Sequence, residues 1–266
     1  NKLFSMISLM QLLNESQGSP KAIILAGAPG AGKGYVLKGL DLGGLKVMNI
    51  DSIFIDKLKT ANVTLDLKNA TPEERSKQAK QMAAANKEFK GDIQSTIEGK
   101  ESFILDGTAA SLKQTSELKI QLEEAGYDVF MLYVYTDLER SLSQNNDRFE
   151  KSGGEDRSLA PAIVMRTWMN VTKNYEPYSD MFGNNFALVA NTLEDKMDNV
   201  EDIIKKYLDP FRPQGTKPKT PAQKEKSDKS YAEMKTDLNS LLKGDFTSDS
   251  SSKEEAQSKI SQFLNS

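Results

Sequence analysis

The sequence predicts an α/β fold with a five-stranded, mostly parallel sheet and helices on both faces. An N-terminal helix precedes this fold, and a largely disordered or helical C-terminal tail follows it. Two observations lead to this prediction. Short apolar runs alternate along the chain with longer segments of helical periodicity, which is typical of βαβ units. The first apolar run also ends in a glycine-rich turn that opens a helix.

Five short apolar runs are expected to be the strands. Runs such as AIILAG and FMLYVY lack polar alternation, as strands that are buried on both faces do. The expected strands cover residues 21–27, 45–51, 101–108, 127–136 and 185–192.

The helices are predicted from their end signals. The clearest helix covers residues 71–99, where Thr71 is the cap, Pro72 lies in the first turn, Glu74 completes a capping box and Gly99 ends the helix. Five more helices are expected at residues 32–43, at 111–126, from about 138, from about 161 and at 194–208.

Composition divides the chain into four parts. Residues 1–20 are predicted to be an amphipathic helix, and residues 21–209 the α/β domain. Residues 210–230 are rich in proline and lysine and are interpreted as a linker. Residues 231–266 are expected to be a low-complexity tail with two weak helices, near 231–242 and 253–264, separated by disorder at 248–252.

The composition also restricts the chemistry. The chain has no cysteine and no histidine, which excludes thiolate nucleophiles, disulfides, Ser-His-Asp catalysis and histidine-ligated metals. Phosphoryl transfer remains open, because it needs mainly positioning and charge stabilisation. The net charge of −3 is not that of a general nucleic-acid binder. No apolar run is long enough for a membrane span, and no signal peptide is recognised, so a cytoplasmic protein is expected.

A phosphate-binding loop follows the first predicted strand. Gly27, Gly32 and Lys33 match G-x-x-x-x-G-K in the context of a strand and a helix. Its backbone amides and the lysine are expected to hold the phosphates of ATP. The alternative is a glycine-rich turn with an incidental lysine. The predicted nucleotide-binding residues are Gly27, Ala28, Pro29, Gly30, Ala31, Gly32, Lys33, Gly34, Tyr35 and, after the fifth strand, Asn191.

The two positions after Lys33 lack the hydroxyl that usually reaches the metal in such loops. They are Gly34 and Tyr35, so Mg²⁺ would have to depend on other residues. Asp51 and Asp106 both come at the end of a predicted strand, where ligands of open α/β sheets bind.

Asp51 is predicted to be the catalytic base and a metal ligand, provided that the second strand neighbours the P-loop strand. The alternative for Asp51 is a helix cap. Asp106 is predicted to hold Mg²⁺ or substrate, and Thr108 to contact substrate. The alternative for Asp106 is an Asx turn.

Arginines gather after the fourth strand. Arg148 and Arg157 flank the glycines of KSGGEDRS, and Arg140 and Arg166 lie further out. Guanidinium groups suit a moving phosphate, so this region is predicted to be a lid, with Arg148 and Arg157 catalytic. The alternative is ordinary charge on solvated helices.

Taken together, these motifs resemble the P-loop kinases around bacterial zeta-type toxins and phage polynucleotide 5′-kinases, with a P-loop like that of adenylate kinases. The resemblance rests on GAPGAGKG, NIDSIF, ILDGT and R-x-x-x-x-G-G-x-x-R. It implies ATP-dependent phosphorylation of a hydroxyl, with Asp51 as the base and Arg148 and Arg157 as the phosphate clamp. The zeta pattern expects an arginine where this chain has Ala110.

The predicted function is therefore an ATP- and Mg²⁺-dependent phosphotransferase. Its acceptor would be a hydroxyl on a nucleotide sugar, another small molecule or a nucleic-acid end. One alternative is a nucleoside monophosphate kinase. Another is a structural or assembly protein that kept the fold, virion-associated if the chain comes from a phage. The N-terminal helix or the tail is expected to contact a protein partner.

Overall fold

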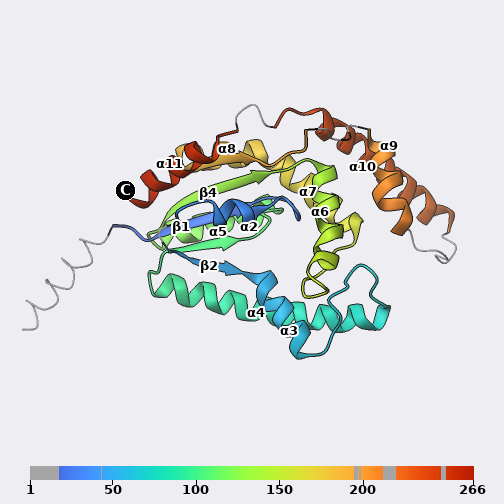
Figure 1. Ribbon diagram of the computed structural model, residues 1–266, viewed down its shortest axis with the longest axis horizontal. Coiled ribbons are helices and arrows are strands. Elements are labelled where there is room, and N and C mark those ends of the chain that lie inside the picture. The colour runs from blue at the N-terminus through green and yellow to red at the C-terminus, as the bar shows by residue number, and fades with distance from the viewer. Residues whose placement is uncertain (1–17, 43, 195–196, 198, 212–219, 247–249) are drawn as a thin grey trace, which may run out of the picture.

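The computed structural model describes residues 18–42, 44–194, 197, 199–211, 220–246 and 250–266. The predicted N-terminal helix lies outside these residues, apart from its last three positions. A five-stranded sheet runs through the molecule, with helices around it (Figure 1). No helix in the described ranges is both long enough and apolar enough to cross a membrane.

All five strands are parallel, as the sequence predicts. They are β1 (Lys21–Ala26), β2 (Lys46–Asn49), β3 (Phe103–Asp106), β4 (Asp128–Tyr135) and β5 (Phe186–Ala190). Their order is β2-β3-β1-β4-β5. The condition placed on Asp51, that the second strand neighbours the P-loop strand, is therefore wrong, because β3 lies between them.

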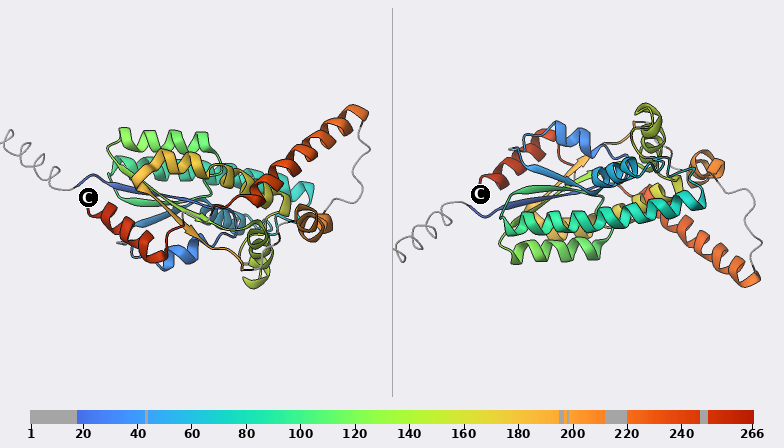
Figure 2. Two further views of the ribbon diagram at one scale, coloured as in Figure 1. Left: turned by 90° about the horizontal axis from the view of Figure 1, so that it is seen from above. Right: turned by 90° about the horizontal axis from the view of Figure 1, so that it is seen from below.

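Alternate residues of β1 enter two separate cores, as expected for a strand with both faces covered. Ala22 and Ile24 pack with α4 (Pro72–Glu98), α5 (Leu112–Glu124) and α8 (Tyr175–Phe182). Ile23 and Leu25 pack with α2 (Lys33–Lys38) and with the C-terminal helix α11 (Lys253–Leu264). Figure 2 shows α2 (blue) and α11 (red) side by side on this face.

A third core lies beyond the carboxyl end of the sheet. It joins α6 (Leu138–Lys151), α7 (Pro161–Lys173), α9 (Val200–Ile203) and α10 (Pro221–Lys243) around Trp168. A small fourth core joins α3 (Ile50–Thr60) to α4 through Phe54, Leu58 and Ala85.

The predicted end signals of α4 are confirmed. The Thr71 hydroxyl accepts a hydrogen bond from Glu74 N at 3.2 Å, and the Glu74 carboxylate accepts one from Thr71 N at 2.7 Å. Pro72 begins the helix and Gly99 follows its last residue. Helix α2 is shorter than expected, because it ends before Gly39.

Both helices predicted in the C-terminal tail are present, but the first begins earlier than expected and both are packed on the α/β domain. Helix α10 starts at Pro221, inside the predicted linker, because Thr220 and Gln223 form a second capping box. Residues 212–219 of that linker lie outside the described residues. Leu238 of α10 and Ile260 of α11 are fully buried in the cores of the α/β domain. Ser252 caps α11, so disorder at residues 248–252 is wrong at least from residue 250 onward.

Candidate nucleotide and acceptor site

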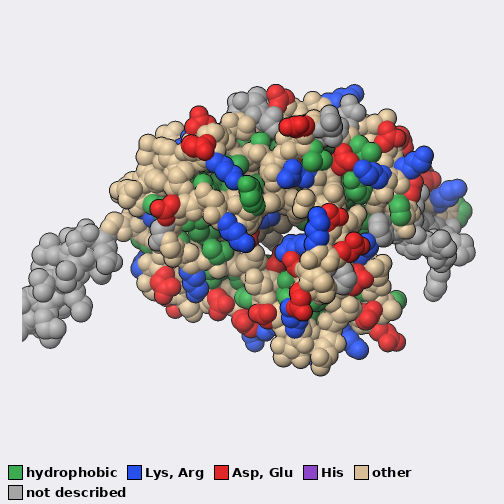
Figure 3. Space-filling view, viewed as in Figure 1, with side chains coloured by type: hydrophobic (Ala, Val, Ile, Leu, Met, Phe, Trp, Pro, Cys, Tyr) green, Lys and Arg blue, Asp and Glu red, His purple; other side chains and the backbone are tan. Residues whose placement is uncertain are grey.

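A pocket of about 460 Å³ lies at the carboxyl ends of β1, β2 and β3, facing α6. Lys and Arg side chains surround the hollow in the space-filling view (Figure 3). The lining residues are Pro29, Gly30, Ala31, Gly32, Lys33, Gly34, Asn49, Ile50, Asp51, Asp106, Gly107, Thr108, Gln144, Asp147, Arg148, Lys151 and Arg157.

The loop after β1 needs glycine at two positions. Gly30 and Gly32 have φ angles of 76° and 83°, in the left-handed region that side chains disfavour. A Cβ on Gly30 would lie 2.6 Å from the Ser141 carbonyl oxygen, and one on Gly32 would lie 2.4 Å from Asn191 Nδ2. The loop therefore follows its path only because these positions carry no side chain.

Side chains behind the loop fix its shape. Ser141 Oγ donates a hydrogen bond to Pro29 O at 2.6 Å, and Asn191 Nδ2 donates one to Ala31 O at 2.8 Å. Asn191 was predicted to bind nucleotide, but it supports the loop from behind and does not line the pocket. Gly27 and Ala28 also lie outside the lining, and their carbonyl groups face Lys33.

Lys33 is held at the mouth of the loop. Its Nζ donates to Gly27 O at 2.9 Å and to Ala28 O at 3.3 Å. Burial lowers the pKa of Lys33 below its usual value, while the Asp106 and Asp51 carboxylates oppose this shift.

Tyr35 points away from the pocket. Its side chain is 69% exposed, and Lys253 Nζ of α11 lies 3.9 Å from the centre of its ring. The prediction that Tyr35 binds nucleotide therefore finds no geometric support. Gly34 does line the pocket, and an added Cβ there would meet open space.

Asn49 connects the Asp106 carboxylate to the backbone of Asp51, and sequence reasoning missed it. Its Nδ2 donates to Asp106 Oδ2 at 2.6 Å, and its Oδ1 accepts from Asp51 N at 2.7 Å. Asn49 is thereby the N-cap of α3, and Asp51 lies in the first turn of that helix rather than at a strand end. An asparagine directly before an apolar helix was the available signal.

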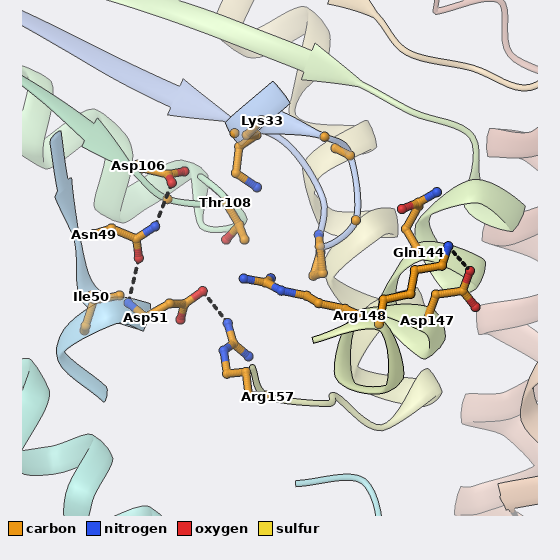
Figure 4. A pocket seen from close by; sticks show the side chains of 17 residues that line it. Lys33, Asn49, Ile50, Asp51, Asp106, Thr108, Gln144, Asp147, Arg148 and Arg157 are labelled. Atoms are coloured by element: carbon orange, nitrogen blue, oxygen red, sulfur yellow. Dashed lines mark hydrogen bonds and ion pairs between the residues drawn. The ribbon is translucent and has the colours of Figure 1, made fainter. Parts of the chain in front are cut away.

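Asp51 is paired with Arg157. Arg157 Nη2 donates to Asp51 Oδ2, and the arginine side chain is only 12% exposed. Its Nε is buried and has no hydrogen-bond partner among the described residues. Figure 4 shows Lys33, Arg148 and Arg157 directed toward the space beside Asp51 and Thr108.

Helix α6 supplies the opposite wall. Arg148 lines the pocket as predicted, and its Nε is paired with Asp156. Gln144, Asp147 and Lys151 were missed, although their spacing with Arg148 is that of one helix face. Arg140 and Arg166 do not line the pocket.

The segment after α6 is attached to the connection between α3 and α4. Ser158 Oγ donates to Asp66 Oδ1 at 2.7 Å, and Ser158 N donates to Leu65 O at 3.2 Å. Lys59 at the end of α3 is paired with Glu155. These contacts, together with the Asp51–Arg157 pair, hold the predicted lid against the side of the pocket that α3 forms.

The residues present fit a Mg²⁺ ion that is held mainly by phosphates. In the described part of the chain, no cluster of three or more acidic or metal-binding side chains forms a cage. Asp106 lines the pocket, and one of its oxygens is bound by Asn49. Mg²⁺ is commonly held by one or two carboxylates, waters and substrate phosphates, which such a site can supply.

The fold and the pocket agree with the family to which the sequence is matched. A family model described as Zeta toxin matches residues 8–182. The chain belongs to the zeta toxin family. This membership confirms the resemblance drawn from the motifs and supports a P-loop phosphotransferase. In this zeta toxin family member, β5 and helices α9 to α11 lie beyond the matched range.

Solved structures resemble the chain at low identity. One belongs to the PezAT chromosomal toxin-antitoxin system of Streptococcus pneumoniae, with 14% identity, 90% of this chain and 96% of that chain covered, and a TM-score of 0.44. Another is an AvrRxo1-ORF1:-ORF2 complex with ATP, with 18% identity, 94% and 82% covered, and a TM-score of 0.47. The sequence matched no curated protein.

Proposed function

We propose that this protein transfers the γ-phosphate of ATP to a hydroxyl group of an acceptor. The observation that carries the proposal is the placement of Asp51 in a P-loop pocket, opposite two arginines from the lid. A carboxylate suits a hydroxyl acceptor, because the hydroxyl must lose its proton during transfer.

Lys33 and the loop amides hold the β- and γ-phosphates. Asp51 takes the proton from the acceptor hydroxyl, whose oxygen forms the new bond to phosphorus as the bond to ADP breaks. Arg157 and Arg148 offer guanidinium groups to the moving phosphate. Asp106 would hold Mg²⁺, which would neutralise part of the phosphate charge.

The ion pair between Asp51 and Arg157 requires a change of partner during this reaction. While it is intact, the carboxylate and the cation satisfy each other. An entering γ-phosphate offers the arginine a more highly charged partner, which leaves Asp51 available to the acceptor. The acceptor class itself rests on Asp51, with Asp106 and Thr108 as further residues that line the pocket.

The test is transfer of label from γ-labelled ATP with Mg²⁺. Acceptors should include UDP-sugars, nucleoside monophosphates and oligonucleotides with a 5′-hydroxyl. Lys33→Ala and Asp51→Asn should both abolish transfer. Asp56→Asn is the matched control, because Asp56 lies on the same helix outside this pocket. Transfer that survives Asp51→Asn would contradict a hydroxyl acceptor and favour a phosphate acceptor. Absence of ATP binding by the wild type would overturn the proposal.

A further inference from the structure

The P-loop helix α2 is poorly stabilised by its own sequence. It has only six residues, its N-cap Gly32 provides no side-chain hydrogen bond, and no acidic residue lies in its first turn. A helix this short is not stable alone in water and depends on tertiary packing. The position of Lys33, its first residue, therefore depends on what α2 packs against.

Helix α11 contributes to that packing. Ala256, Ile260 and Phe263 of α11 share one buried core with Val36 and Leu40 of the P-loop segment. All three α11 residues are at most 6% exposed. The two elements are separated by more than 200 positions in the chain, so this contact exists only when the C-terminal segment is folded back.

Two polar contacts align α11 with the exposed side of α2. Gln257 Oε1 accepts from Asp41 N at 2.7 Å, and its Nε2 donates to Asp41 O at 2.9 Å. Lys253 Nζ lies over the Tyr35 ring. The Gln257 pair fixes the chain just after α2, and Lys253 contacts the first turn of α2.

Helix α11 is itself fixed to the sheet. Ser251 N donates to Leu188 O at 2.8 Å, and Lys259 Nζ donates to Phe186 O at 3.3 Å, both on β5. Helix α11 is thus hydrogen-bonded to β5 on one side and packed with the α2 segment on the other. It contacts α2 from the side opposite the phosphates, since neither Tyr35 nor any residue of α11 lines the pocket.

We infer that α11 is a positioning element for the nucleotide site, and that Lys253 and Gln257 are its positioning residues. Tyr35 occupies a position where other P-loops carry a metal-binding hydroxyl. Here its ring is contacted by Lys253 of α11. Docking of α11 and binding of ATP are then coupled, so each strengthens the other. This inference rests on ATP binding, as proposed above.

The first test measures the affinity for ATP with Mg²⁺ by calorimetry. Lys253→Ala and Gln257→Ala should each weaken binding about threefold, and the double variant about tenfold. Gln262→Ala is the matched control, because Gln262 is an exposed glutamine of the same helix. Lys253→Arg should restore wild-type affinity, since arginine can also lie over an aromatic ring. The urea concentration at the unfolding midpoint should stay close to the wild-type value in these variants, so that the loss of ATP affinity is not a loss of folded protein.

The second test uses the wild-type chain and needs no substitution in α11. ATP should slow hydrogen exchange of the amides at residues 253–264, by reciprocity of the coupling. The same experiment with Lys33→Ala, which should not bind ATP, should leave that exchange unchanged.

The outcomes separate this inference from the proposed function. If the wild type binds ATP and all variants of α11 match Gln262→Ala, the inference is wrong while the kinase proposal stands. Unchanged exchange of α11 at saturating ATP would also overturn it. If the wild type does not bind ATP, the proposed function is wrong, and the inference about α11, which rests on it, is wrong with it.

Discussion

The Asp51 carboxylate and the Arg157 guanidinium form an ion pair across the pocket, joining α3 to the segment that follows α6. The pair places the proposed base and a proposed phosphate ligand in direct contact. It also explains how a side chain as polar as Arg157 can be almost completely covered. Removing one partner leaves the other unpaired in a partly buried place.

Arg157→Ala should lower the rate of phosphate transfer about 100-fold, because one preorganised donor to the moving phosphate is lost. ATP affinity should change much less, since Lys33 and the loop amides remain. Steady-state transfer kinetics with varied ATP distinguish the two effects. Arg166→Ala, which removes an exposed arginine outside the pocket, should leave both unchanged. An equal effect of the two variants would refute the role of Arg157.

The affinity for ATP should fall at alkaline pH earlier than an ordinary lysine would allow. Burial lowers the pKa of Lys33, and only its protonated form attracts phosphate. The affinity for ATP is therefore at its full value when the pH is below this lowered pKa. It falls as the pH rises through that pKa, so the fall begins at a lower pH than the usual lysine pKa of about 10.4 would give. Calorimetry over this pH range measures the effect. Lys33→Arg should remove the pH dependence, because arginine does not titrate there.

Substitutions of Asn49 should separate its two roles. Asn49→Ala removes the cap of α3 and should lower the free energy of unfolding by about 1 kcal/mol. Asn49→Asp retains a capping oxygen but loses the donor to Asp106 and places two carboxylates together. Its transfer activity should therefore fall with little loss of capping. Urea unfolding and transfer assays check this pair of results. Full activity in Asn49→Asp would show that the link to Asp106 is dispensable.

The loop after β3 contains local strain that glycine should relieve. Ala109 has a φ of 51°, and Tyr178 OH donates to its carbonyl oxygen at 2.7 Å. Tyr178→Phe should therefore destabilise the protein by about 1 kcal/mol. The loss should be smaller in an Ala109→Gly background, because glycine adopts this conformation without strain. A double-mutant cycle in urea measures the coupling. Ala84→Gly, in the middle of α4, is the contrasting control and should destabilise by about 1 kcal/mol.

Leu238→Ala should lower the free energy of unfolding by about 2–4 kcal/mol. Leu238 belongs to α10 and is fully buried in the core around Trp168. Ile163→Ala, at a half-exposed position of α7, should cost far less. Thermal or urea unfolding distinguishes the two variants. No change on truncating Leu238 would mean that α10 does not pack on the domain in solution.

The strands and the longest helix were predictable because their signals are local. Apolar runs mark β1 and β4, and Thr71, Glu74 and Gly99 mark the ends of α4. Strand order is different in kind. The order depends on the position in the sheet to which each connection between strands leads. No residue near Asp51 indicates that β3 lies between β1 and β2.

The P-loop and the lining by Asp51, Asp106, Thr108, Arg148 and Arg157 were also anticipated. Asn49 was not, because its importance comes from a contact with another strand. The packed tail was missed because serine and lysine dominate its composition. Three apolar residues of α10, Met234, Leu238 and Leu241, nevertheless follow helical spacing and lie along one face of that helix.

The fourth core has a consequence for how this family could diversify. Phe54, Leu58 and Ala85 join α3 to the first half of α4 without using any residue of the sheet. This helical hairpin carries Asp51, whereas the phosphate loop belongs to β1 and α2. Substitutions in the hairpin can accumulate without disturbing the donor half of the pocket. A lineage could thus exchange one acceptor for another through substitutions in α3 and the first half of α4, while Phe89, Ile93 and Ile97 keep the second half of α4 packed on the sheet.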